Sequence, residues 1–202
     1  MFSLKTCNRA DECRAELCAL LSGKYEGGVR WGALLSSFDV VVEHHKAIIG
    51  LVRAGLYRSA FALVRAIVET CYRGHWLARC ASDMQIRKLI RNKSRFPSMK
   101  QMADEVDRAL DTEGLYRGLL EEDRWDAMCD YTHTGARQLS KRSLGARIQP
   151  NYSDEEVISV IGVSTSAMLM FGRLLAIMAE RKPAADQIEQ MIIDFATALG
   201  WN

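Results

Sequence analysis

Apolar residues recur along most of this chain at the spacing of helices rather than strands. No run alternates apolar and polar residues as a half-buried strand would. Only three prolines occur in 202 residues, which also favours long helices. The length suits one domain with a sizeable core. The pattern therefore predicts an all-α fold, a single helical bundle of about seven helices spanning residues 1–202.

Glycine and proline divide the chain into pieces of helix length. Ser98 with Gln101 and Ser153 with Glu156 have the spacing of capping boxes, in which the two side chains satisfy each other's backbone amides. Pro183 suits the first turn of a last helix. The helices expected with defined ends cover residues 7–21, 31–53, 57–80 and 183–199, around a core from about 31 to 180.

One apolar stretch, "VISVIGVSTSAMLMFGRLLAIM" at 157–178, approaches the length of a membrane span. Serine, threonine and glycine are frequent in it, Arg173 interrupts it, and it follows an acidic cap. These features favour a buried core helix and no membrane association. The first residues lack a basic segment followed by an apolar one, so we expect a cytoplasmic protein whose six cysteines are free thiols.

Charge is unevenly distributed, although the net charge is only +2. Residues 85–103 hold six basic side chains and no acid, residues 104–130 hold ten acids and three bases, and residues 131–153 hold four bases and no acid. One interpretation is that the basic and acidic segments face each other or water. The other is that the two basic segments flank an anionic ligand such as RNA.

Two charged residues interrupt the apolar segment "AFALVRAIVET". Arg65 and Glu69 are four residues apart and share one face of the expected helix. A lone buried charge is costly, so they should pair with each other or with groups on another helix. The pair either fixes helix register or forms a polar pocket in which the arginine meets a phosphate.

The stretch "CDYTHTGARQLSKR" at 129–142 is unusually polar for this chain. If residues 122–141 form one helix, then Asp130 and Arg137 lie on the same face as His133. Asp130 would then orient the imidazole. Gly135 weakens the assumption of one helix, and a turn there would put His133 near a helix end. His133 is either catalytic or structural. The full stripe would comprise Asp126, Asp130, His133, Arg137 and Lys141.

The sequence contains no known motif for binding a metal or a cofactor. No Cys-x-x-Cys pair, phosphate-binding glycine loop or His-Glu-x-x-His motif occurs. His44 and His45 are adjacent, so on a helix they point about 100° apart and are poorly placed to share a metal. We expect neither a metal site nor a cofactor.

The segment "RSAFALVRAIVET…WLAR", followed some fifty residues later by Tyr-x-His before a glycine, resembles a family of small helical bacterial proteins of unknown function. That family is grouped with the HEPN-like superfamily, and the resemblance covers about residues 35–145. It implies a helical bundle that dimerises. Many HEPN proteins are metal-independent ribonucleases of toxin–antitoxin or phage-defence systems, and others are inactive binding domains.

The resemblance implies a ribonuclease with His133, Arg65, Glu69 and Arg137 as catalytic residues. The active signature places an arginine four to six residues before the histidine, whereas Arg124 is separated from His133 by eight residues. RNA, a protein partner or antitoxin, and a second copy of the chain are the partners implied. The alternative is a non-catalytic helical module that binds or regulates a protein. The substrate-binding candidates are Tyr131, Thr134, Asp130, Gln138 and Arg142.

Overall fold

The computed structural model describes residues 2–25, 27–118, 120, 122–141, 143–144, 147–148 and 151–201. Within these ranges the chain forms ten helices and one short β-hairpin, which confirms the all-α class. The count exceeds the predicted seven largely because one helix is a single turn and another is split at Thr134 and Gly135.

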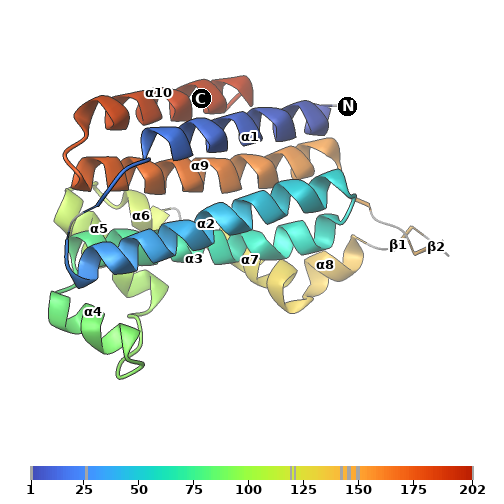
Figure 1. Ribbon diagram of the computed structural model, residues 1–202. Coiled ribbons are helices and arrows are strands. Elements are labelled where there is room, and N and C mark those ends of the chain that lie inside the picture. Colours follow the sequence, from blue (N-terminus) through green and yellow to red (C-terminus); the bar gives the residue numbers. More distant parts are fainter. Residues whose placement is uncertain are drawn as a thin grey trace.

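Five long helices build the bundle and lie roughly along a common direction (Figure 1). Their ends fall within five residues of the predicted ends, and the largest difference is at the first helix, which begins at residue 2 rather than 7. They are α1 (Phe2–Leu20), α2 (Val29–Arg53), α3 (Tyr57–Arg79), α9 (Asp154–Met178) and α10 (Lys182–Ala198).

The apolar helix α9 is central, because it packs against α1, α2, α3 and α10. It is long and apolar enough to cross a membrane by length and composition, but 67% of its most apolar window is buried by the other helices. Its small residues allow close approach. A Cβ at Gly172 would lie 2.4 Å from Leu17 Cδ1 of α1. These contacts favour the predicted core helix over a span.

Short helices join α3 to α9 and cover the outer side of α3 (Figure 1). Helices α5 and α7 pack directly on α3, α6 packs on α5, and α8 follows α7. A hairpin of two-residue strands, β1 (Ser143–Leu144) and β2 (Arg147–Ile148), comes before α9. The helices are α4 (Asp83–Ile90), α5 (Met99–Leu110), α6 (Leu115–Gly118), α7 (Glu122–His133) and α8 (Ala136–Ser140).

The predicted caps are partly correct. Ser153 and Glu156 form both bonds of a capping box at the start of α9, as predicted. At the start of α5, Ser98 accepts from the Gln101 amide at 3.2 Å, but the Gln101 side chain donates to Glu105 instead of returning to Ser98. Only one of the two bonds predicted at Ser98 therefore forms, because the charged Glu105 one turn later binds the Gln101 side chain.

Candidate functional site

One face of α3 carries a line of charged side chains. Arg65 Nε donates to Glu69 Oε1 at 2.8 Å, and Arg73 Nη2 donates to Glu69 Oε2 at 3.0 Å. The spacing of four residues places all three side chains on successive turns. The Arg65 and Glu69 side chains remain 23% and 19% exposed, so the predicted pairing is correct but the pair is open to solvent.

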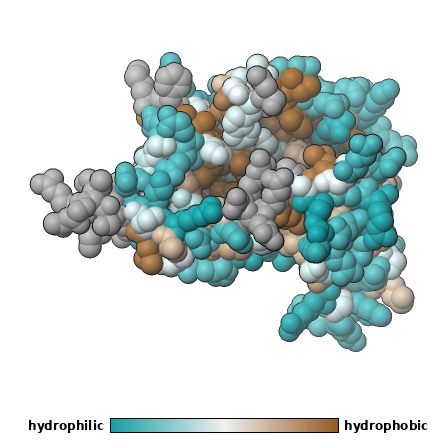
Figure 2. All heavy atoms as spheres, turned by 180° about the vertical axis from the view of Figure 1, so that it is seen from behind, coloured by the Kyte–Doolittle hydropathy of each residue, from teal (hydrophilic) through white to brown (hydrophobic). Residues whose placement is uncertain are grey.

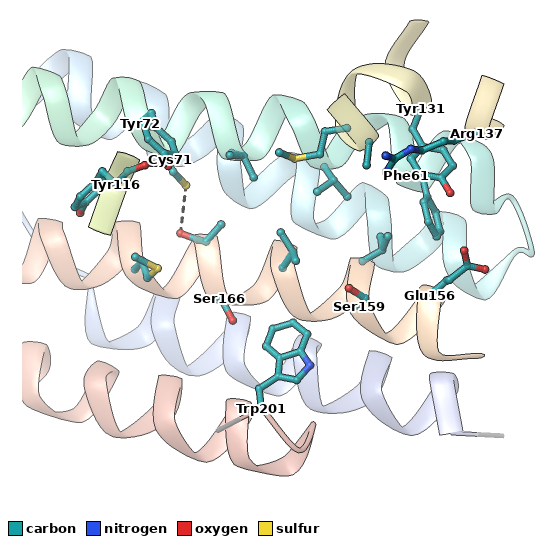
Figure 3. A pocket seen from close by; sticks show the side chains of 18 of the residues that line it. Phe61, Cys71, Tyr72, Tyr116, Tyr131, Arg137, Glu156, Ser159, Ser166 and Trp201 are labelled. Carbon is teal, nitrogen blue, oxygen red and sulfur yellow. Dashed lines mark hydrogen bonds between the residues drawn. The ribbon is translucent and has the colours of Figure 1, made fainter. Parts of the chain in front are cut away.

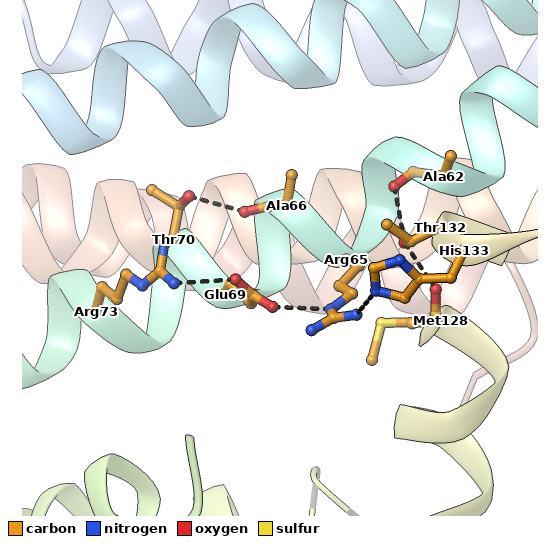
Figure 4. A network of polar contacts seen from close by, with 9 residues as sticks. All are labelled: Ala62, Arg65, Ala66, Glu69, Thr70, Arg73, Met128, Thr132 and His133. Atoms are coloured by element: carbon orange, nitrogen blue, oxygen red, sulfur yellow. Dashed lines mark hydrogen bonds and ion pairs between the residues drawn. The ribbon is translucent and has the colours of Figure 1, made fainter. Parts of the chain in front are cut away.

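His133 meets this line from α7 (Figure 4). Its Nε2 lies 2.8 Å from Arg65 Nη1, although the two residues are 68 positions apart in sequence. Thr132 Oγ1 donates to the backbone oxygens of Ala62 at 3.3 Å and Met128 at 2.8 Å, which ties the end of α7 to α3. His133 itself is exposed. The structure therefore joins three of the predicted residues in one accessible cluster.

The chemistry of the Arg65–His133 contact fixes the state of the histidine. A guanidinium has donors and no acceptor, so Nε2 of His133 must accept with its lone pair. The imidazole in this contact is thus neutral, with its proton on Nδ1. The guanidinium of Arg65 also lies over the Trp125 ring, 5.1 Å from its centroid. Trp125 is a member of this cluster that sequence reasoning missed, because only the packing of α7 on α3 brings the two together.

Helix α7 ends at His133, so of the two alternatives for this stretch the turn at Gly135 is confirmed, and the continuous stripe through Lys141 does not form. Thr134 has a left-handed backbone with φ of 57°, and the Gly135 amide donates to the Asp130 oxygen at 2.7 Å. Asp130 Oδ2 accepts from the Arg137 amide at 3.1 Å and so caps α8. Asp130 makes this contact with α8 and none with the His133 ring, contrary to the orienting role we expected.

The remaining predicted residues occupy other surroundings than the Arg65–Glu69–His133 cluster. Thr134 occupies the turn and is exposed. Tyr131 packs against Phe61 with ring centroids 4.7 Å apart. Gln138 is only 6% exposed, and its Oε1 has no hydrogen-bond partner among the described residues. Arg142 lies outside the described residues.

Arg137 belongs to a different feature, an elongated cavity of about 950 Å³ between α3 and α9. Val64 and Val68 of α3 and Val163 and Met170 of α9 are among its apolar lining residues. Figure 3 shows Phe61, Tyr131 and Glu156 near one end of the cavity and Tyr72 and Tyr116 near the other. Figure 2 shows hydrophobic side chains gathered in the hollowed centre of this face, with hydrophilic ones around them. His133, Arg65 and Glu69 are not among its lining residues. Helix α3 thus separates two sites.

The cavity leaves a signal in the sequence of α9. Glu156, Ser159, Val163, Ser166 and Met170 are three or four residues apart, so they share one face of α9, and all of them line the cavity. Their burial is lower than on the opposite faces of the helix. In a helix that is apolar almost all round, such a face cannot be recognised from the sequence alone. Only the packing shows that no other helix of the described part of the chain covers it.

Titratable groups at one end of the cavity are held neutral. Burial lowers the pKa of His75 to about 4, and the His75 Nδ1 proton is donated to the Cys71 carbonyl at 2.8 Å. Burial also raises the pKa of the Cys71 thiol far above its usual range, and this thiol donates to the Ala167 carbonyl at 3.3 Å. A protonated thiol is a poor nucleophile. The thiol at this end of the cavity is therefore a poor nucleophile.

Comparison with known proteins identifies a family but no activity. A family model described as "Family of unknown function (DUF6988)" matches residues 38–200, so the chain belongs to that family. No curated protein and no solved structure matches the chain. In the described part of the chain, no three histidine, cysteine or acidic side chains are placed to hold a metal ion.

Proposed function

We propose that this member of a family of unknown function is an HEPN-like, metal-independent ribonuclease whose catalytic centre is the Arg65–Glu69–His133 cluster. The observation that carries the proposal is the 2.8 Å contact between Arg65 Nη1 and His133 Nε2 on an accessible surface. It supplies a neutral imidazole beside a fixed cation, and these two groups can catalyse phosphodiester transfer without a metal.

Charge favours a phosphate at this cluster. Arg65 and Arg73 contribute two positive charges, and Glu69 contributes one negative charge. The three side chains together carry one positive charge, on the face of α3 that the neutral His133 contacts. Glu69 holds the Nε edge of Arg65 and thereby directs its Nη atoms toward His133. A phosphate oxygen can replace Nε2 as the acceptor of the Nη1 proton, because charge-assisted bonds from arginine to phosphate are strong.

Substrate binding would then release the base. Once a phosphate takes the Arg65 Nη1 donor, the His133 Nε2 lone pair is free beside it. Nε2 accepts the proton of the ribose 2′-hydroxyl, and the 2′-oxygen forms a bond to phosphorus while the bond to the 5′-oxygen breaks. The leaving oxygen takes its proton from solvent at this exposed site. The products are a 2′,3′-cyclic phosphate and a free 5′-hydroxyl.

The test is cleavage of a single-stranded RNA oligonucleotide in EDTA by the purified protein. We expect cleavage with cyclic phosphate ends. His133→Ala should reduce the rate by about 100-fold or more, as removal of a general base does. His44→Ala, a histidine of α2 outside the cluster, is the matched control and should cleave like the unaltered protein. Equal cleavage by the unaltered protein and His133→Ala, or none by either, would refute the proposal.

The second candidate is a non-catalytic helical module that binds or regulates a partner, such as an antitoxin or a second copy of the chain. The cavity beside α3 favours it, since its lining is mostly apolar and its thiol is held protonated. Absence of RNA cleavage together with ligand binding in this cavity would support this candidate.

A further inference from the structure

Residues 84–97 form a basic segment, which comprises most of α4 and the loop that leads to α5. They hold five basic side chains and no acidic one. All five are exposed, and none forms an ion pair or a side-chain hydrogen bond with another described residue. On α1, α2, α3, α6 and α9, by contrast, arginines pair with carboxylates at 2.6–3.3 Å. The five are Arg87, Lys88, Arg91, Lys93 and Arg95.

Two acidic side chains on either side of the basic segment are paired with other cations. Asp83 Oδ1 accepts from Arg30 Nη2 at 3.0 Å, and Asp104 Oδ1 accepts from Arg117 Nη1 at 2.6 Å. Helix α4 packs against α2, and the first acid on α2 after Arg30 is Asp39, about 14 Å further along the helix. Asp39 can therefore offset at most one of the five charges.

The remaining acids of this region do not neutralise the basic segment either. Glu105 of α5 accepts from the side chains of Trp76 and Gln101, and Lys100 on the same helix offsets its charge. The acids at positions 111 and 113 lie past the other end of α5, which is about 18 Å long, about twice the screening length in physiological salt. The basic segment therefore keeps an excess of positive charge.

The loop of the basic segment meets the charged row of α3. Phe96 lies beneath Arg73, with the Arg73 Cζ 5.2 Å from the ring centroid. The same ring packs edge-on against Trp76 of α3, with centroids 6.1 Å apart. Arg95 directly precedes Phe96. The basic segment is thus anchored on α3 where the row of Arg73, Glu69 and Arg65 begins.

The basic segment and the Arg65–Glu69–His133 cluster form one continuous track of cations. Arg73 and Arg65 are eight residues apart, so the row on α3 covers about 12 Å before it reaches His133. At its other end α4 projects from the bundle (Figure 1), and its projecting surface is mostly hydrophilic (Figure 2). Cations in such a row are complementary to a ligand with regularly spaced anions, which are the phosphates of a nucleic-acid strand.

The apolar residues of α4 argue against a membrane surface as the polyanion. Ile86 is fully buried and Leu89 packs against the core, so the apolar face of α4 is already covered. The exposed apolar side chains, Met84 and Ile90, are six positions apart and therefore point about 120° away from each other. No second apolar face remains that could enter a bilayer.

We propose that the basic segment binds single-stranded RNA and holds the strand beside the bond that is cut at the Arg65–Glu69–His133 cluster. The five cations contact successive phosphates, and Arg73 lies between the two sites. Since the cut itself rests on the proposed function, binding is measured separately from cleavage.

The test is fluorescence anisotropy of a labelled oligouridine of about 20 nucleotides, titrated with the full chain carrying His133→Ala in EDTA. The titration is repeated between about 50 and 200 mM salt. In the same protein, Lys88→Gln, Arg91→Gln and Lys93→Gln are combined. Each phosphate contact contributes about −0.7 to the slope of log affinity against log salt, so the slope should become shallower by about 2. At about 0.1 M salt the affinity should fall about 100-fold.

The matched control removes three cations from other surfaces. Lys5→Gln, Lys46→Gln and Lys182→Gln lie on α1, α2 and α10, where these side chains are exposed and form no ion pair with described residues. The change in net charge is the same, so a general effect of charge would weaken binding equally in both combinations. We expect the control to bind within about 2-fold of the His133→Ala protein. Circular dichroism reports whether each variant is folded.

The proposal is overturned if the His133→Ala protein does not bind the RNA, or if both combinations bind it equally. It is also overturned if phosphatidylserine-containing vesicles bind the basic segment and RNA does not. RNA binding that depends on the basic segment, in a protein that cleaves no RNA, would refute the ribonuclease and leave the binding site standing. Cleavage by the unaltered protein, together with equal binding by the two combinations, would refute the binding site alone.

Discussion

At position 135 the surroundings, rather than the backbone, require glycine. Its φ of −74° and ψ of −176° are open to other residues. A Cβ there, however, would lie 2.1 Å from Asp130 Oδ1 and 3.0 Å from the Asp130 Cα. Asp130 is held in place because its carboxylate caps α8 and its carbonyl accepts from the Gly135 amide. One missing side chain thus allows the chain to turn directly after His133.

Gly135→Ala should therefore destabilise the protein by about 1–2 kcal/mol, the usual cost of losing a helix cap. Urea unfolding followed by circular dichroism measures this. Gly32→Ala is the matched control, since a Cβ at position 32 meets nothing within 4 Å and alanine favours the interior of α2. An unchanged midpoint for Gly135→Ala would show that Asp130 moves aside at no cost.

The residues of the charged cluster were predictable to different degrees. Arg65 and Glu69 followed from a spacing of four in an apolar segment, and their pairing is local. His133 was identified by its polar neighbours, but its contact with Arg65 depends on how α7 lies on α3. The role of Asp130 was missed, because an aspartate three residues before a histidine looks the same in sequence whether it orients the ring or caps the next helix.

At the scale of elements, the packing of α3 on α9 depends on one close approach. A Cβ at Gly74 would lie 2.3 Å from Phe171 Cζ. Phe171 is fully buried and packs edge-on against Phe38 of α2, with ring centroids 5.8 Å apart. The ring therefore has little room to retreat, and Gly74 sets the distance between α3 and α9 at this end of the cavity.

Gly74→Ala should cost about 1–3 kcal/mol, as overpacking of a well-filled core does. It should leave the Arg65–His133 cluster unchanged, because that cluster lies on another face of α3. Thermal unfolding measures the loss of stability. Gly50→Ala on α2, where a Cβ meets nothing within 4 Å, is expected to leave the stability unchanged. Stability equal to that of the unaltered protein would contradict the packing argument.

The ends of the long helices could be read from sequence because caps and breakers are local. Ser153 with Glu156 and Pro183 each mark a helix start within a few residues. The short helices could not be separated in this way. The boundary between α7 and α8 depends on one left-handed residue, Thr134, of a type that rarely adopts that conformation. The cavity was equally hidden, because it results from what α3 and α9 leave uncovered.

At the scale of the whole molecule, two buried histidines link α9 to its neighbours. His45 of α2 is fully buried, and its Nε2 lies 3.1 Å from Thr165 Oγ1, which donates its own proton to the Ile161 carbonyl. Nδ1 of His45 has no partner among the described residues. Burial lowers the pKa of both His45 and His75 to about 4. The folded bundle therefore holds both rings neutral.

This arrangement predicts loss of stability in mild acid. The unfolded chain binds a proton at each histidine below a pKa of about 6.5, whereas the folded chain resists protonation until about pH 4. The contribution is thus fully present above pH 6.5 and is lost as the pH falls toward 4. Between pH 7 and 4.5 the free energy of unfolding should fall by about 2 kcal/mol per histidine, as measured by urea unfolding.

Other titrating groups do not account for a loss of stability between pH 7 and 4.5. Asp11 and Arg14 are the charged neighbours of His45. Hydrogen bonds from Arg53 and Arg14 lower the pKa of Asp11 and outweigh the effect of its burial. The stability that Asp11 contributes is therefore lost only below about pH 4. The charged neighbour of His75 is Arg79, which does not titrate there. His45→Leu should remove about half of the pH dependence, whereas His44→Gln should leave it intact. A free energy of unfolding that stays constant from pH 7 to 4.5 would mean that these rings are protonated in the folded bundle as readily as in the unfolded chain.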